Sequence, residues 1–387
     1  MNVIRRALGV LRLPDLSVDA NCHAIGIYIS SRGICGKTLR EKVDKPAPFP
    51  YEKKNFYPYI HGLYDDCRDR FDENSAIICV EGMPHAGKSK LAAGLAEELD
   101  MKYYPAVSMD EIYKQPNGDD IRNYRDVLPG NVYPWDVNDF LKDPKNKHNG
   151  RLQVEIYKLR FMQYANAVTH LLSTGQGVIL EQNPYSDVAF TEAMIECGYI
   201  SKQVEEWYKI MILSTHCEIL HPHLIVYLDS PVNEIEKRIK EKHGQIPPAL
   251  ATKFLETLNN RYKYGYLPEI SQHSEMLVYD WTEMGDEEVV VEDIERINFD
   301  RQLDPDNQLF KDWRKLEFRH QWNDIRYRLG TCKNRLETLF QIPTHRVPEL
   351  FVPVDEAEAL YLVQDKIQGK YATGFNPKAG DSVLFKI

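Results

Sequence analysis

The chain has 387 residues, of which 43% are hydrophobic and 27% charged, the composition of a globular protein with a substantial core. Its formal net charge of −10 argues against DNA or RNA as a partner, because a nucleic-acid-binding surface needs a basic footprint, whereas a small phosphorylated ligand stays compatible with that charge. The seven cysteines include no CxxC pair, which argues against a disulfide framework and for a reducing compartment, and no apolar run reaches the roughly 18–20 residues that span a membrane.

The N-terminal segment, residues 1–35, is predicted to be a mitochondrial transit peptide. Arg5, Arg6 and Arg12 are interspersed among aliphatic residues, which would give a helix one basic and one apolar face. Two aspartates interrupt this pattern, and a disordered cytosolic tail is the alternative interpretation. The import signal predicts that the mature protein lies in the mitochondrial matrix.

Residues 36–75 are predicted to form an extended N-terminal arm. Pro46, Pro48, Pro50 and Pro58 fall within thirteen residues. Each proline fixes φ and lacks a backbone donor, so this segment does not suit a helix or a central strand. We expect it to run over a surface, either as a linker or as an arm laid across a neighbour.

A phosphate-binding loop follows the first predicted strand. Residues 76–81 form a short apolar run with β-branched members, which is typical of a buried strand. The next eight residues, Gly82-Met-Pro-His-Ala-Gly87-Lys88-Ser89, match the Walker A pattern GxxxxGK[ST]. Leucines then recur at helical spacing. The context strand, loop, helix is the one that this motif requires.

The residue types in this loop fit the binding of phosphate. Gly82 and Gly87 permit backbone angles that turn amide N–H groups inward, and Ala86 lies in the same loop. Lys88 places a positive charge on the β and γ phosphates, and Ser89 is an expected Mg²⁺ ligand. We therefore predict a site for ATP or a deoxynucleotide with Mg²⁺. The alternative is a loop that persists as a structural turn with an empty site.

Strands and helices alternate through residue 300, which predicts an α/β fold. Long helical patterns separate the strands, beginning with residues 151–172. Such alternation implies a parallel sheet with helices on both faces, that is, a three-layer fold with five parallel strands. The four strands expected after the first are residues 102–107, 177–181, 223–229 and 276–279.

The order of these motifs resembles the deoxyribonucleoside kinase family over residues 76–300. After the P-loop and a long helix come Leu180-Glu181, then Tyr185-Ser186, then Val226-Tyr-Leu-Asp-Ser-Pro231 and a basic helix. The resemblance implies a P-loop kinase fold and a nucleotide pocket.

Further patterns are similar to the deoxynucleoside-kinase-like accessory subunits of mitochondrial respiratory complex I, the NADH:ubiquinone oxidoreductase. They are Leu171 to Glu181, Val291 to Glu295, and a tail from Gly369 to Asp381 that the free kinases lack. This resemblance implies a non-catalytic subunit needed for assembly or stability, with other complex I subunits as partners, on the matrix side of the inner membrane and peripheral to it. An FAD site has been ascribed to that family, but no residue pattern in this chain supports one.

The residues that a kinase needs for catalysis are incomplete by this resemblance. The family places its general base just after the second strand, where this chain has Ala106, and Asp110 and Glu111 come only slightly later. Glu181 matches the family and is implied to help hold Mg²⁺ through water. Gln182 stands where the family has an arginine, and a neutral amide cannot form a charged fork with phosphate. We therefore assign no catalytic residue.

The basic helix after the fourth strand is the expected lid over the phosphates. Arg238 and Lys240 are predicted to contact nucleotide, with Lys242 nearby, and a solvated helix face is the alternative for this run of charge. An active mitochondrial deoxynucleoside kinase is the main competing function, because Gly87, Lys88 and Ser89 are intact. A nucleotide-sensing regulator is a third.

Two further segments carry weaker patterns. His216, Cys217, His221 and His223 cluster before the fourth strand, but their spacing fits no structural zinc pattern, which favours a polar connection over a metal site. Residues 301–387 are predicted to be a helical extension for docking, in which apolar residues from Phe310 to Leu336 suggest one long helix.

Overall fold

The computed structural model describes residues 33–38, 40, 44–51, 60, 62, 64–115, 118–297, 309–341 and 346–368. The predicted transit peptide lies outside the described residues except for 33–35, as does the tail pattern from Gly369 to Asp381. Within the described part of the chain, no helix has the length and apolar content to cross a bilayer.

The centre of the fold is a five-stranded parallel sheet, as predicted. Its order is β2-β3-β1-β4-β5, and every neighbouring pair is parallel. All six residues of β1 are buried, in agreement with the apolar run from Ile77 to Val80. The strands are β1 Ile77–Gly82, β2 Lys102–Tyr104, β3 Val178–Glu181, β4 Leu224–Asp229 and β5 Glu275–Asp280.

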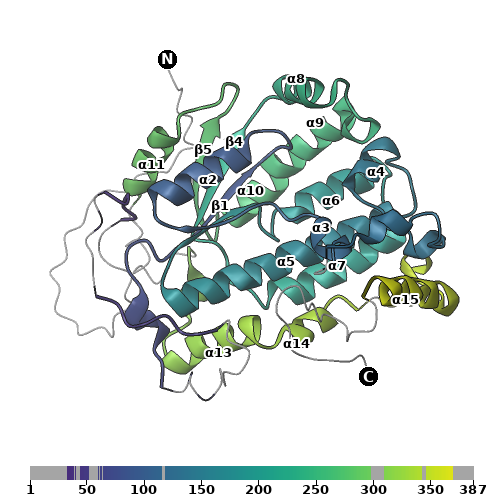
Figure 1. Ribbon diagram of the computed structural model, residues 1–387. Helices are drawn as coiled ribbons and strands as arrows, with labels where there is room; N and C mark the ends of the chain where they lie inside the picture. Colours follow the sequence, from purple (N-terminus) through teal and green to yellow (C-terminus); the bar gives the residue numbers. More distant parts are fainter. Residues whose placement is uncertain are drawn as a thin grey trace.

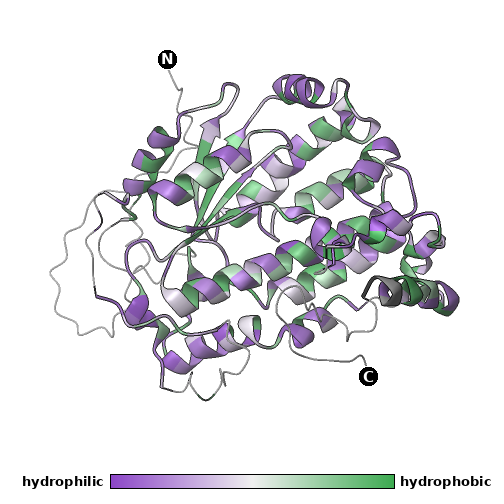
Figure 2. Ribbon diagram, in the orientation of Figure 1, coloured by the Kyte–Doolittle hydropathy of each residue, from purple (hydrophilic) through white to green (hydrophobic). Residues whose placement is uncertain are grey.

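Helices flank the sheet on both faces, and in Figure 1 α2 and α11 lie on one side while α5, α6 and α9 lie on the other. Figure 2 shows apolar colouring along the strands and more polar colouring on the outer helices. These helices are α2 Lys88–Glu98, α3 Asp110–Tyr113, α4 Val137–Lys142, α5 Asn149–Thr174, α6 Asp187–Glu196, α7 Lys202–His216, α8 Val232–His243, α9 Thr252–Arg261, α10 Leu267–Ile270 and α11 Glu287–Glu295.

β2 is shorter than predicted and ends at Tyr104. Pro105 follows, and a proline has no N–H with which to continue the ladder. The chain therefore leaves the sheet here, which brings Ala106 to the edge of a cavity.

The C-terminal extension is helical but does not form the single long helix that the apolar spacing predicted. Phe318 has extended backbone angles (φ −106°, ψ 145°), which interrupt the helix. Its N–H donates to the Gln321 side chain at 2.8 Å, and a new helix begins after it. The helices of the extension are α12 Lys311–Arg314, α13 Arg319–Gly330, α14 Lys333–Thr338 and α15 Val354–Gln368.

The extension packs along α5, below it in Figure 1. At Gly330 in α13, a Cβ atom would lie 2.6 Å from Cγ2 of Thr169 in α5, so the two helices approach too closely for a larger residue. Farther along, the Glu356 carboxylate of α15 accepts a bond from the Asn131 N–H at 2.8 Å.

The described part of the predicted N-terminal arm lies on the chain's own core. Phe49 is buried, and its N–H bonds to the Ser173 carbonyl at 2.8 Å. Arg70 in turn donates to the Ala47 carbonyl at 2.9 Å. Before the arm, Ile34 is buried and the Gly36 N–H bonds to the Glu295 carboxylate at 2.7 Å, so residues 33–36 pack beside α11.

Candidate nucleotide-binding site

The P-loop joins β1 to α2, as the sequence predicted. Gly82 has φ +148°, and a Cβ atom there would lie 2.8 Å from the Leu228 carbonyl oxygen of β4. Gly87 has φ +92° and is the N-cap of α2. Both positions therefore require glycine. Because Gly87 has no side chain to cap the helix, the first amides of α2 stay available to an anion.

Lys88 is held inside the loop. Its Nζ donates to the carbonyls of Gly82 at 3.0 Å and Met83 at 2.8 Å. Burial lowers the pKa of Lys88, because it disfavours the charged ammonium, while the carboxylates of Glu81 and Glu181 oppose this shift. Lys88 thus lies within the P-loop, and its contact with phosphate stays a prediction.

Glu81 lies buried beneath the loop. One of its oxygens accepts bonds from the backbone N–H and the side-chain amide of Asn183, both at 2.8 Å. Burial raises the pKa of the Glu81 carboxyl above its usual range. Glu81 therefore connects the end of β1 to the segment after β3 and supports the loop from below.

Ser89 and Glu181 meet at the mouth of the loop, which is the predicted Mg²⁺ position. Ser89 Oγ donates to Glu181 Oε2 at 2.9 Å, and the Tyr103 hydroxyl donates to Glu181 Oε1. Hydroxyl and carboxylate oxygens are the ligands that Mg²⁺ prefers. The donor set therefore fits the ion: Ser89 and Glu181 would hold it, and it would neutralise phosphate charge.

A cavity of about 490 Å³ opens from the P-loop and runs between α4, α5 and α6. Its volume is in the range of small-molecule sites, and apolar walls with a few polar groups are typical of them. The apolar walls include Phe140, Leu152, Ile156, Phe190 and Met194. The polar side chains that line it are His85, Lys88, Ser89, Gln153, Arg160, Glu181, Gln182 and Lys242.

Three residues of this region, Gln153, Arg160 and Asp187, were not predicted from the sequence. Gln153 and Arg160 project from α5, and both bond to the buried carboxylate of Asp187: the Gln153 amide donates at 2.7 Å, and the Arg160 guanidinium forms an ion pair. Arg160 also donates to the Gln182 side chain at 2.9 Å. A guanidinium therefore reaches this wall from α5, although position 182 lacks an arginine. The spacing of seven residues, which puts both polar side chains on one helix face, was the available signal.

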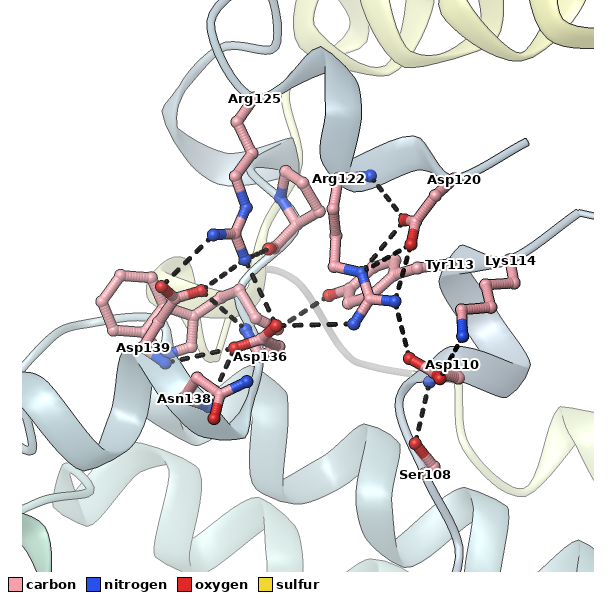
Figure 3. Close-up of polar contacts among 12 residues, drawn as sticks. Ser108, Asp110, Tyr113, Lys114, Asp120, Arg122, Arg125, Asp136, Asn138 and Asp139 are labelled. Atoms are coloured by element: carbon pink, nitrogen blue, oxygen red, sulfur yellow. Dashed lines mark hydrogen bonds and ion pairs between the residues drawn. The ribbon is translucent and has the colours of Figure 1, made fainter. Parts of the chain in front are cut away.

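Ala106, Asp110 and Glu111 lie at or just after the position at which the family places its general base. Ala106 lines the cavity, and Figure 3 shows Asp110 turned toward Arg122 and Lys114, each ion pair measuring 2.6 Å. Glu111 accepts from the Ser108 N–H at 3.3 Å. Neither Asp110 nor Glu111 lines the cavity. Among the described residues that do line it, Glu181 is the one carboxylate, and its oxygens face Ser89 and Tyr103.

The predicted lid residues have different positions. Arg238 donates to three carbonyls, those of Ala86 at 3.3 Å, Trp281 at 3.0 Å and Thr282 at 2.9 Å, so it ties α8 to the P-loop and to the segment after β5. Lys240 is exposed and does not line the cavity, whereas Lys242 does.

The histidine cluster before β4 forms polar and ring contacts. His223 Nδ1 accepts from the Ile77 N–H at 3.0 Å, and His221 pairs with Asp312 of the C-terminal extension at 3.0 Å. The described residues contain no group of three or more potential ligands placed to hold a metal ion.

Comparisons with known proteins identify the family of this chain. A protein-family model described as deoxynucleoside kinase matches residues 78–316. The bovine NADH dehydrogenase [ubiquinone] 1 alpha subcomplex subunit 10, mitochondrial, is 34% identical over 340 residues, which cover 86% of this chain and 93% of that protein.

More distant matches are kinases. A deoxyguanosine kinase of Dictyostelium discoideum is 26% identical over 58% of this chain and 70% of its own. A solved structure of deoxyadenosine kinase from M. mycoides with bound dATP matches with a TM-score of 0.41 and 20% identity, over 56% of this chain and 96% of that one. From the family model and the bovine match, the chain belongs to the deoxynucleoside kinase family and, within it, to the group of the mitochondrial NADH dehydrogenase 1 alpha subcomplex subunit 10 proteins.

Proposed function

We propose that this protein is a non-catalytic accessory subunit of mitochondrial complex I, needed for the assembly or stability of that complex. The observation that carries the proposal is the bovine match, which covers 86% of the chain and 93% of the bovine subunit. The kinase model ends at residue 316, so the match extends beyond the kinase core. We place the protein on the matrix side of the inner membrane, with other complex I subunits as its partners.

The geometry of the cavity supports a loss of phosphoryl transfer. Removal of a proton from the attacking hydroxyl contributes typically 10²–10⁴-fold to a rate. Ala106 cannot accept that proton, and Asp110 is held by Arg122 and Lys114. Glu181 lies beside Ser89, where Mg²⁺ is expected to bind. A kinase with this arrangement would turn over very slowly, although its P-loop amides would still bind phosphate.

We propose that the cavity still binds ATP or a deoxynucleotide, with Mg²⁺ between the phosphates and the pair Ser89 and Glu181. The P-loop with Lys88 suits the phosphates, and the apolar wall with Gln153 and Arg160 suits a nucleobase or sugar. Both groups line one continuous cavity, so a single nucleotide would reach both.

Blue-native electrophoresis of mitochondria tests the assembly role. We expect the protein to migrate with NADH dehydrogenase activity, and we expect its depletion to lower the amount of assembled complex. Re-expression of a Lys88→Ala variant serves as a matched control, since a purely structural role does not need the phosphate contact. A protein that migrates as a free monomer, away from that activity, contradicts the proposal.

The second candidate is an active mitochondrial deoxynucleoside kinase, which the intact Gly87, Lys88 and Ser89 favour. Purified protein would then convert a deoxynucleoside and ATP to a monophosphate, and Lys88→Ala would abolish that product. We expect no product above the background of the Lys88→Ala variant, and a clear difference between the two would restore the kinase assignment.

A further inference from the structure

The hydroxyl of Tyr103 lies against the carboxylate of Glu181, next to the phosphate loop. We infer that Tyr103 is a positioning residue that orients Glu181 toward nucleotide-bound Mg²⁺. The inference rests on the proposed nucleotide binding and adds a role that the Walker A motif does not contain. It concerns the affinity for metal and nucleotide, so it can be tested without any catalytic activity.

Adjacent parallel strands place the two residues together. β2 pairs with β3 in the register Tyr103 to Ile179 and Tyr104 to Leu180, and Glu181 ends β3 at the carboxyl edge of the sheet. From there Glu181 extends toward α2. The Tyr103 hydroxyl donates to Oε1, and the Ser89 hydroxyl donates to Oε2 at 2.9 Å. Each oxygen of Glu181 therefore has its own hydroxyl partner.

The two partners have different roles. Ser89 is the residue of the P-loop that would bind Mg²⁺ directly, so Oε2 already faces the metal position. Tyr103 does not line the cavity and bonds to the other oxygen, so that bond can persist when a metal arrives. Hydrogen-bond partners of this kind commonly orient metal-binding carboxylates and tune their affinity.

The charges around Glu181 explain why its orientation matters. A buried carboxylate beside a triphosphate is repelled by it, unless a cation sits between the two. The Lys88 ammonium also attracts the Glu181 carboxylate. The Tyr103 bond holds the carboxylate in the orientation in which Oε2 meets Ser89.

The neighbouring tyrosine supplies a matched control. Successive side chains of a strand point to opposite faces, so Tyr104 points away from the face that carries Tyr103. Its ring lies under the Lys102 ammonium, 5.2 Å from Nζ to the ring centroid. The changes Tyr103→Phe and Tyr104→Phe each remove one hydroxyl from the same strand, and only the first removes the bond to Glu181.

Calorimetric titration of the purified full chain tests the inference. ATP and each deoxynucleoside triphosphate are titrated in millimolar Mg²⁺ and again in excess EDTA. We expect Mg²⁺ to tighten binding in the wild type. Tyr103→Phe should reduce this Mg²⁺-dependent gain about 10-fold, a loss typical of removing a residue that orients a metal ligand, and leave affinity in EDTA unchanged. Tyr104→Phe should match the wild type in both conditions.

A double-mutant cycle covers the case in which the phenylalanine variant loses fold stability. Glu181→Gln removes the charge that binds Mg²⁺ but keeps an acceptor for Tyr103, and in that background Tyr103→Phe should have no further effect on the Mg²⁺ response. The inference is overturned if the effects of Tyr103→Phe and Glu181→Gln on the Mg²⁺ response are additive. It is also overturned by an equal loss with and without Mg²⁺, or by a stronger Mg²⁺ response in Tyr103→Phe, which would make Tyr103 a competitor of the metal. If the wild type binds none of the nucleotides, the proposed nucleotide binding itself is wrong.

Discussion

Arg326 of α13 forms an ion pair with Asp65 of the N-terminal arm, with 2.5 Å between Nη1 and Oδ2 and only 4% and 16% of the two side chains exposed. Arg70 pairs with the same carboxylate. The two arginines hold the pKa of Asp65 below its usual range, although burial alone would raise it. One carboxylate therefore joins two points of the arm to the C-terminal extension.

Removal of Arg326 should strongly destabilise the protein. Arg326→Ala leaves a largely buried carboxylate with one partner fewer, and breaking a buried pair in this way costs about 3–5 kcal/mol. Chemical denaturation measures the free energy of unfolding. The control is Arg335→Ala, which removes an exposed arginine that pairs with Glu218 at 2.9 Å and should cost less than about 1 kcal/mol. Equal effects of the two changes would contradict the structural role of the Arg326 pair.

Lys88→Ala should abolish nucleotide binding while the chain stays folded. The Lys88 ammonium donates to the carbonyls of Gly82 and Met83 in its own loop, so its loss removes charge from the predicted phosphate position more than it removes packing. In a thermal-shift assay, ligand at about 100 times its Kd should stabilise the wild type by about 2.7 kcal/mol, and the variant should show no such shift. Lys90→Ala changes an exposed lysine two residues later and should respond like the wild type. A full shift in Lys88→Ala would place the ligand elsewhere.

Arg238→Ala should lower stability even without nucleotide. The guanidinium donates to the carbonyls of Ala86, Trp281 and Thr282, and bonds from a charged donor contribute about 1.5–3 kcal/mol. The melting temperature of the ligand-free variant checks this expectation. Lys240→Ala, on the exposed side of the same helix, should melt like the wild type. A ligand-free Arg238→Ala variant as stable as the wild type would instead favour a role for Arg238 in phosphate binding alone.

His223 should make stability depend on pH. Burial lowers its pKa from 6.5 to about 4 in the folded state, so the unfolded chain binds more protons between these values. The stability that His223 contributes is therefore complete above pH 6.5 and is lost as the pH falls toward 4, at about 1.4 kcal/mol per pH unit. Denaturation at several pH values, for the wild type and His223→Gln, isolates this slope.

The wild type has to be compared with His223→Gln because Glu81 changes stability with pH in the opposite direction. Burial raises the pKa of Glu81 from 4.5 to about 7, so its contribution is present below pH 4.5 and is lost as the pH rises through 7. The difference between the wild type and His223→Gln cancels this background. If the difference stays constant from pH 7 to pH 5, His223 is not buried as a neutral ring.

The sheet and the P-loop could be predicted because local sequence determines them. A buried strand needs a continuous apolar run, and the loop needs glycine where φ is positive, as at Gly82 and Gly87. The predicted strand 102–107 extended past the observed end of β2 at Tyr104. It contained Pro105, which has no N–H with which to continue the strand pairing. The break before α13 was missed because the apolar spacing continues across it. The backbone of Phe318, however, is extended and interrupts the helix there.

The wall of the cavity could not be predicted from local sequence. Asp187 follows β3, whereas Gln153 and Arg160 belong to α5, and only the tertiary fold brings these side chains within hydrogen-bond distance. The positions of the lid residues could not be predicted for a related reason. Charge alone cannot tell which residue of α8 faces inward, and the fold gives Arg238 three carbonyl partners and leaves Lys240 in solvent.

Helix α5 carries Gln153 and Arg160 toward the cavity and, near its other end, meets α13 at Thr169 and Gly330. This one helix of 26 residues thus lines the cavity and also supports the outer layer of the protein. If a ligand in the cavity and a neighbouring subunit on α13 both restrict the motion of α5, the binding of each favours the binding of the other, because such coupling is reciprocal. The concentration of the proposed nucleotide ligand would then affect how tightly this subunit binds to the rest of complex I.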